Sequence, residues 1–171
     1  RTSRRQRQMC IRDRVLVDHN GDLSLPPASL TKIMTSYVLA EEVDAGRASL
    51  DDMIKVSRNA WSQNPTFKGS SLMWIEPGKP VSLADLERGV VISSGNDASV
   101  AVAEHLAGTE SSFVDVMNQL AAELGLDNTV YRNPHGLPHP EHRTTARDLA
   151  TLSVALINGH PEHYKIYKEQ S

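Results

Sequence analysis

Ser29 and Lys32 stand three residues apart at the beginning of an apolar run that extends to Val38. Residues at this spacing share a face of a helix, so the serine hydroxyl and the lysine amine can meet. A buried lysine loses its charge readily, and a neutral amine can accept the serine proton. The pair therefore has the chemistry of a nucleophile and its general base. Serine is also a common helix cap, and the spacing alone leaves that second interpretation open.

A second polar group, Ser94-Gly95-Asn96, lies between two apolar runs of helical periodicity. Gly95 supplies the backbone freedom that a sharp corner requires, and Asn96 and Asp97 are typical caps for a helix expected at 98–106. Short polar side chains on a rigid corner suit either a plain turn or a site that holds a substrate. The local sequence is compatible with both.

Taken together, the two motifs resemble those of the low-molecular-mass penicillin-binding proteins, the D-alanyl-D-alanine carboxypeptidase family. Further segments resemble that family in the same order, from about residue 15 to residue 171: PASLTKIMTSYVLA, KGSSLMWIEPG, VSLADLERGVVISSGNDASVAVAEHLAG, LGLDNTVYRNPHGL and TARDLATLSVALI. The resemblance implies an α+β fold of the β-lactamase/DD-peptidase type. The chain would supply mainly the helical cluster of that fold, with the antiparallel sheet incomplete.

The resemblance also assigns roles. It implies that Ser29 is the nucleophile, Lys32 the general base and Ser94 a proton relay, while Asn96 binds the substrate and holds Lys32. The substrate would be the D-Ala-D-Ala end of a peptidoglycan stem peptide, and β-lactams would acylate the same serine. No cofactor or metal is implied. The location would be the cell envelope, either the periplasm or the outer face of the cytoplasmic membrane, and the parent protein could be membrane-anchored.

One family motif, Lys-Thr-Gly on a strand, is absent from the sequence. We therefore expect this chain alone to be nearly inactive.

Two other functions remain as alternatives to a carboxypeptidase. A class A β-lactamase is disfavoured because no glutamate is followed four residues later by asparagine, and because Gly95 replaces the aspartate of Ser-Asp-Asn. The second alternative is a non-catalytic relative that binds peptidoglycan through the same cleft.

Charge is distributed unevenly along the chain. Six of the 18 basic residues lie within residues 1–14, beside one of the 21 acidic residues, so residues 15–171 carry twelve basic and twenty acidic side chains. Such an acidic body excludes a basic nucleic-acid-binding patch. The family resemblance stops at Arg14, and we expect residues 1–14 to be a non-native basic head and residues 15–171 a partial catalytic domain. Cys10, the only cysteine, lies in that head.

Periodicity and turn residues predict the elements that position the two motifs. We expect a central, largely buried helix from Ser29 to a stop at Gly46, and a helix capped by Ser82 that leads to the Ser94 corner. Two further helices are expected, one around 113–124 and one capped by Thr145 and ending before Gly159. Strands are expected at 15–18, 53–57 and 72–75, and core packing for Trp61, Phe67 and Trp74.

Three histidines, His135, His139 and His142, lie within eight residues of one polar loop. Such clustering raises a zinc hypothesis, in which the chain would be a zinc D,D-peptidase. Pro138 and Pro140 prevent these histidines from sharing a helical face, and neither a His-Glu-x-x-His motif nor a cysteine partner accompanies them. We therefore predict no metal site.

Overall fold

The computed structural model describes residues 10–11, 14–15 and 17–169. Its helices are α1 (Thr31–Asp44), α2 (Leu83–Val91), α3 (Asn96–Ala107), α4 (Glu110–Glu123), α5 (Ala146–Gly159) and α6 (Pro161–Tyr164), with 3-10 turns η1 (Ala28–Leu30), η2 (Pro65–Phe67) and η3 (Lys165–Lys168). Its named strands form two antiparallel pairs: β1 (Cys10–Ile11) with β2 (Arg14–Val15), and β3 (Met53–Ile54) with β4 (Val81–Ser82). The expected α+β chain dominated by helices is therefore present.

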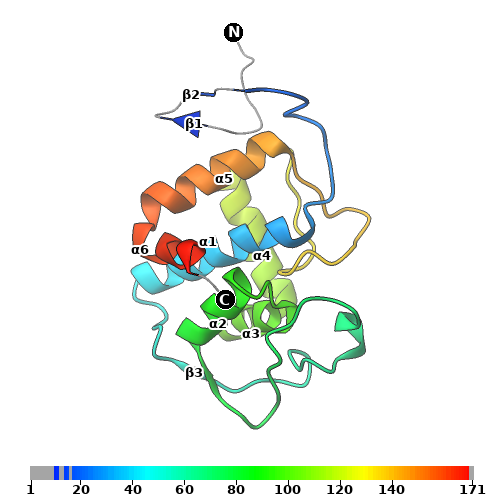
Figure 1. Cartoon of the computed structure of the whole chain (residues 1–171), viewed down its shortest axis with the longest axis vertical. Helices are drawn as coiled ribbons and strands as arrows, with labels where there is room; N and C mark the ends of the chain where they lie inside the picture. Colours follow the sequence, from blue (N-terminus) through cyan, green and yellow to red (C-terminus); the bar gives the residue numbers. More distant parts are fainter. Residues whose placement is uncertain (1–9, 12–13, 16, 170–171) are drawn as a thin grey trace.

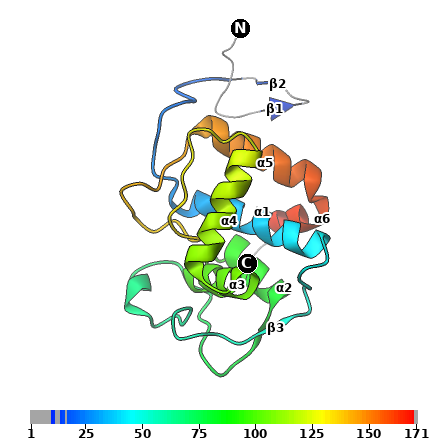
Figure 2. The same cartoon turned by 180° about the vertical axis from the view of Figure 1, so that it is seen from behind.

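Helix α1 is the centre of the structure (Figure 1). It lies between α5 on one side and the α2–α3 pair on the other, and α4 also packs against it (Figure 1, Figure 2). Nine of its residues are buried, polar Thr31, Lys32, Thr35 and Ser36 among them. A helix with neighbours on most of its circumference cannot shift without repacking them. The predicted central, buried helix is confirmed.

Caps and stops end the helices largely where the sequence places them. Ser82 Oγ accepts from Asp85 N at the start of α2, and Thr145 Oγ1 accepts from Asp148 N at the start of α5. Gly46 adopts a positive φ of 71° just after α1. These predictions are confirmed. Helix α3 differs slightly, because Gly95 takes the cap position and Asn96 is already the first helical residue.

The strand predictions are less accurate. The strand expected at 15–18 is replaced by β2, which ends at Val15, and the one expected at 53–57 is only Met53–Ile54. No strand forms at 72–75, because the backbone N–H groups of residues 73–75 donate to the carboxylate of Asp97 instead of to a neighbouring strand. The predicted strand at 72–75 is therefore wrong.

The predicted aromatic core is correct in part. Phe67 is buried, whereas Trp61 is half-buried and Trp74 is 74% exposed. The predicted head, residues 1–14, lies mostly outside the described residues and stays a prediction. Among the described helices, none is long and apolar enough to cross a bilayer.

Candidate active site

Lys32 projects from the first turn of α1 into the protein interior and is only 4% exposed. Its Nζ donates to Asn96 Oδ1 at 2.7 Å and to the backbone oxygen of His135 at 2.7 Å. Burial lowers the pKa of Lys32 to about 8, although the negative charge of Asp97 acts in the opposite direction. Both direct partners are neutral, so nothing in contact with the amine fixes it in the charged form.

Ser29 lies in η1, directly before α1, and is exposed. Neither η1 nor α1 has a side-chain cap, so the alternative interpretation of Ser29 as a helix cap does not apply. The preceding residue, Ala28, has φ of +50°. Left-handed backbone at a non-glycine residue is uncommon and is often found at functional sites. The serine hydroxyl is therefore free for chemistry on the same end of α1 as Lys32.

The corner between α2 and α3 brings the second motif to the first. Asn96, buried in the first turn of α3, contacts Lys32 across 64 residues of sequence. Ser94 is half-buried and adopts φ of +53°, and Gly95 N donates to Gly89 O. The structure thus joins Lys32 and Asn96 directly and places Ser94 two residues away on the same strained corner.

A third segment, residues 133–137, completes the surroundings of Lys32. Thr35 Oγ1 donates to Pro134 O at 2.6 Å, next to the Lys32 contact with the His135 carbonyl. Gly136 approaches η1 so closely that a Cβ there would lie 1.9 Å from Ala28 O, and its φ is +91°. Sequence reasoning named this segment for its family resemblance and its histidine but missed its contact with Lys32, since that contact uses a backbone carbonyl that any residue could supply.

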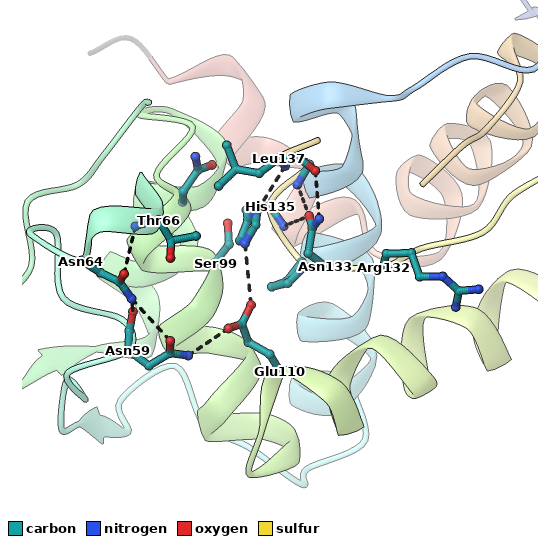
Figure 3. A network of polar contacts seen from close by, with 12 residues as sticks. Asn59, Asn64, Thr66, Ser99, Glu110, Arg132, Asn133, His135 and Leu137 are labelled. Atoms are coloured by element: carbon teal, nitrogen blue, oxygen red, sulfur yellow. Dashed lines mark hydrogen bonds and ion pairs between the residues drawn. The ribbon is translucent and has the colours of Figure 1, made fainter. Parts of the chain in front are cut away.

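The 133–137 segment is fixed by its own polar network (Figure 3). Asn133 Oδ1 accepts from Gly136 N and Asn133 Nδ2 donates to Leu137 O. The His135 ring points toward Glu110 on α4, with Nε2 3.7 Å from Oε2, and Glu110 in turn accepts from Asn59. The nearby His135 ring lowers the pKa of Glu110, while burial of the carboxylate acts in the opposite direction. The carbonyl that holds Lys32 is therefore part of a rigid turn.

The histidines of the predicted polar loop have separate partners. His142 is buried, its Nδ1 accepts from Arg132 N, and its Nε2 lies 2.8 Å from Thr31 Oγ1. Burial lowers the pKa of His142 to about 4, so the ring is neutral and Nε2–H donates to Thr31. His135 contacts Glu110, and His139 is exposed. No group of three potential ligands is placed to hold a metal ion in the part of the chain that the structure describes.

Asp97 is a further residue that sequence reasoning treated only as a cap. It is completely buried, and its carboxylate accepts from the backbone of residues 73–75 and from Ala98 N. The sequence did contain a signal for this role. Asp97 is a charged residue next to Asn96 at an otherwise apolar helix start, and a buried charge there needs hydrogen-bond partners.

Comparisons with known proteins find similar proteins over most of the chain. The family model described as D-alanyl-D-alanine carboxypeptidase matches residues 11–171. The chain is similar to D-alanyl-D-alanine carboxypeptidase DacC of Escherichia coli (strain K12), with 49% identity over 158 residues, which are 92% of this chain and 40% of that protein. The chain therefore spans about 40% of the length of this curated relative.

Solved structures show the same likeness. The crystal structure of penicillin binding protein 6B from Escherichia coli matches with a TM-score of 0.89 and 45% identity, over 92% of this chain and 50% of that one. Penicillin-binding protein D2 from Listeria monocytogenes, solved in its ampicillin-bound form, matches with a TM-score of 0.72 and 30% identity, over 88% of this chain and 59% of that one.

Proposed function

The chain belongs to the D-alanyl-D-alanine carboxypeptidase family, and from this premise we propose that the complete protein that carries it removes the terminal D-alanine from peptidoglycan stem peptides in the cell envelope. The resemblance predicted from the two motifs and the DD-peptidase-like fold are confirmed. The observation that carries the proposal is the buried amine of Lys32, without an anion in direct contact, three residues from the exposed Ser29.

The hydrogen bonds of Lys32 suit a neutral base. A neutral amine has two N–H donors and one lone pair, and the two acceptors around Nζ, Asn96 Oδ1 and His135 O, satisfy both donors. The lone pair is then left to accept a proton. With a pKa of about 8, roughly a tenth of the lysine is neutral at pH 7. That fraction is large enough for general-base catalysis.

The proposed reaction has two stages. Lys32 takes the hydroxyl proton of Ser29 while Oγ attacks the carbonyl carbon between the two D-alanines, and the peptide C–N bond breaks. The proton passes through Ser94 to the leaving amine of D-alanine. Water then hydrolyses the ester on Ser29 and restores the hydroxyl, and Asn96 holds both the substrate backbone and Lys32. A β-lactam would form the same ester, which accords with the ampicillin-bound form of the Listeria relative.

Covalent labelling by a fluorescent penicillin tests the proposal most directly. In the complete protein we expect wild type to be labelled and to release D-alanine from a D-Ala-D-Ala peptide, and we expect Ser29→Ala to do neither while keeping its circular dichroism spectrum. Ser112→Ala, which removes an exposed serine on α4, is the matched control. Absence of labelling in the folded wild type would instead favour a non-catalytic, peptidoglycan-binding relative.

Labelling of Ser29→Ala at the wild-type rate would exclude Ser29 as the nucleophile. Rapid turnover of the penicillin without D-alanine release would favour the β-lactamase alternative.

A further inference from the structure

The carboxylate of Asp97 is buried without a cationic partner in contact. Oδ1 accepts from Met73 N at 2.8 Å and Ala98 N at 2.9 Å, while Oδ2 accepts from Trp74 N at 2.9 Å and Ile75 N at 3.2 Å. Burying a charge is costly unless hydrogen bonds replace its water, and four amide donors do so here. Three of these bonds join Asp97 to residues 73–75, which are distant in sequence. Asp97 therefore holds a second segment in place besides capping α3.

The bonded segment has no regular structure of its own. Residues 71–75 lie in neither a helix nor a strand, and the structure secures them at both ends, because Asn96 N also donates to Ser71 O at 2.9 Å. Trp74 adopts φ of +67° and is 74% exposed. Left-handed backbone is strained for a tryptophan, and an exposed indole gains little from burial. The bonds to Asp97, together with the backbone bonds at Ser71 O and Ile75 O, therefore hold this backbone in place.

The negative charge of Asp97 also acts on Lys32. Lys32 and Asp97 flank Asn96, whose side chain contacts Lys32 and whose backbone contacts the 71–75 segment. The negative charge of Asp97 raises the pKa of Lys32 against the larger lowering by burial.

The other ionisable groups near Lys32 have partners of their own. His135 pairs with Glu110 on α4, and neutral His142 bonds to Thr31 on α1 and to Arg132 N. Asp97 is thus the anion that acts on the lysine from α3.

We propose that Asp97 is a positioning residue for the Ser29–Lys32 site, which fixes the 71–75 segment to the Ser94-Gly95-Asn96 corner and supplies the negative charge that balances Lys32. The proposal rests on the proposed function for its catalytic meaning. The proposal has two physical consequences that can be measured without turnover. The 71–75 segment is anchored, and the titration midpoint of Lys32 is raised by the charge of Asp97.

The test compares three variants of the complete protein. Asp97→Asn removes the charge and replaces one acceptor oxygen by a donor, Asp97→Glu keeps the charge but moves the carboxylate, and Asp115→Asn removes an exposed charge on α4 as the control. Amide hydrogen exchange at residues 73–75 reports the anchor. An NMR titration of the Lys32 side chain, assigned with Lys32→Arg, reports the charge.

In Asp97→Asn we expect exchange at residues 73–75 to accelerate by about tenfold or more, as the loss of one buried hydrogen bond would produce. We expect the midpoint of Lys32, and the rising limb of penicillin acylation with it, to move to lower pH. Asp97→Glu should show the faster exchange with a midpoint nearer wild type, and Asp115→Asn should change neither. A merely structural role would lower acylation without moving its pH midpoint.

An Asp97→Asn protein that folds and keeps both wild-type exchange and the wild-type Lys32 midpoint would overturn the proposal. If that variant does not fold, amide exchange in the wild-type protein decides the question. Exchange at residues 73–75 as fast as in exposed loops would overturn the proposal. Absence of penicillin labelling in wild type would refute the proposed function and leave both measurements intact.

Discussion

His163 Nδ1 lies 2.5 Å from Glu87 Oε1, and this buried pair ties α6 to α2. The carboxylate raises the pKa of His163, mainly through the hydrogen bond, while burial acts in the opposite direction. Asp44 lies 3.8 Å from His163 Nε2 and also contacts the neighbouring His160. The helix that leads to the Ser94 corner is therefore held at its middle by the His163 imidazole.

This pair predicts a pH-dependent stability. A histidine whose pKa is raised on folding stabilises the protein fully below its unfolded pKa, about 6.5, and loses that contribution as pH rises through the folded pKa. We expect the free energy of unfolding to fall as pH rises above about 6.5, and His163→Gln to flatten that dependence. Urea denaturation across this range measures it, with exposed His19→Gln as control. Identical pH profiles for wild type and His163→Gln would contradict the assignment.

Removing the imidazole has a larger expected effect. His163→Ala leaves Glu87, 1% exposed, without its imidazole partner. Breaking a buried pair in this way typically costs about 3 kcal/mol or more. Urea denaturation of His163→Ala and of the His163→Ala/Glu87→Leu double variant measures this cost. The double variant should recover part of the loss, since it removes the buried charge as well.

Acylation should depend on the protonation of Lys32. Because the base must be neutral and its pKa is about 8, the rate of acylation by penicillin should rise about tenfold per pH unit at lower pH and level off above about pH 8. Lys32→Arg should be nearly inactive at every pH, since a guanidinium stays charged. A flat rate profile between pH 6 and about 9 would rule out Lys32 as the base.

The 171-residue chain alone should show little or no turnover. Its sequence contains no Lys-Thr-Gly, which by family resemblance would hold the substrate carboxylate on the far wall of the cleft. Loss of a single oxyanion donor typically costs about 10² to 10³ in rate, and loss of a whole wall should cost more. D-alanine release and penicillin labelling by residues 1–171 measure this, with the complete protein as reference. Comparable turnover by both would show that two motifs suffice.

Gly136 should tolerate no side chain. A Cβ at this position would lie 1.9 Å from Ala28 O, and the positive φ adds strain. We expect Gly136→Ala to lower the free energy of unfolding by about 2 kcal/mol or more and to slow acylation by moving the His135 carbonyl. Gly159→Ala, where nothing lies within 4 Å, is the matched control and should be neutral or slightly stabilising. Equal stability of the two variants would contradict the close approach.

Local chemistry explains which elements could be predicted from sequence. Ser82 and Thr145 cap helices through bonds three residues away, and Gly46 stops α1 through its own backbone, so each signal lies within a few positions of its effect. The Ser29–Lys32 spacing is likewise local. These features required no knowledge of the tertiary arrangement.

The remaining features depend on distant partners. The 72–75 segment has the composition of a strand, but composition does not say which acceptor its N–H groups will find, and that acceptor is Asp97 more than twenty residues away. The exposure of Trp74 has the same cause. The lysine contact with residue 135 spans 103 positions and uses a backbone atom. No pattern of residue types encodes such contacts.

That backbone contact has a consequence for how the site tolerates evolutionary change. Every amino acid carries a carbonyl, so the hydrogen bond of Lys32 at position 135 does not depend directly on the side chain there, although the His135 ring helps to fix the turn. The selective constraint instead lies on the conformation of the turn, and so on Gly136 and on Asn133, whose side chain holds it. A search restricted to invariant polar side chains would find Asn133 but overlook Gly136 and the carbonyl itself.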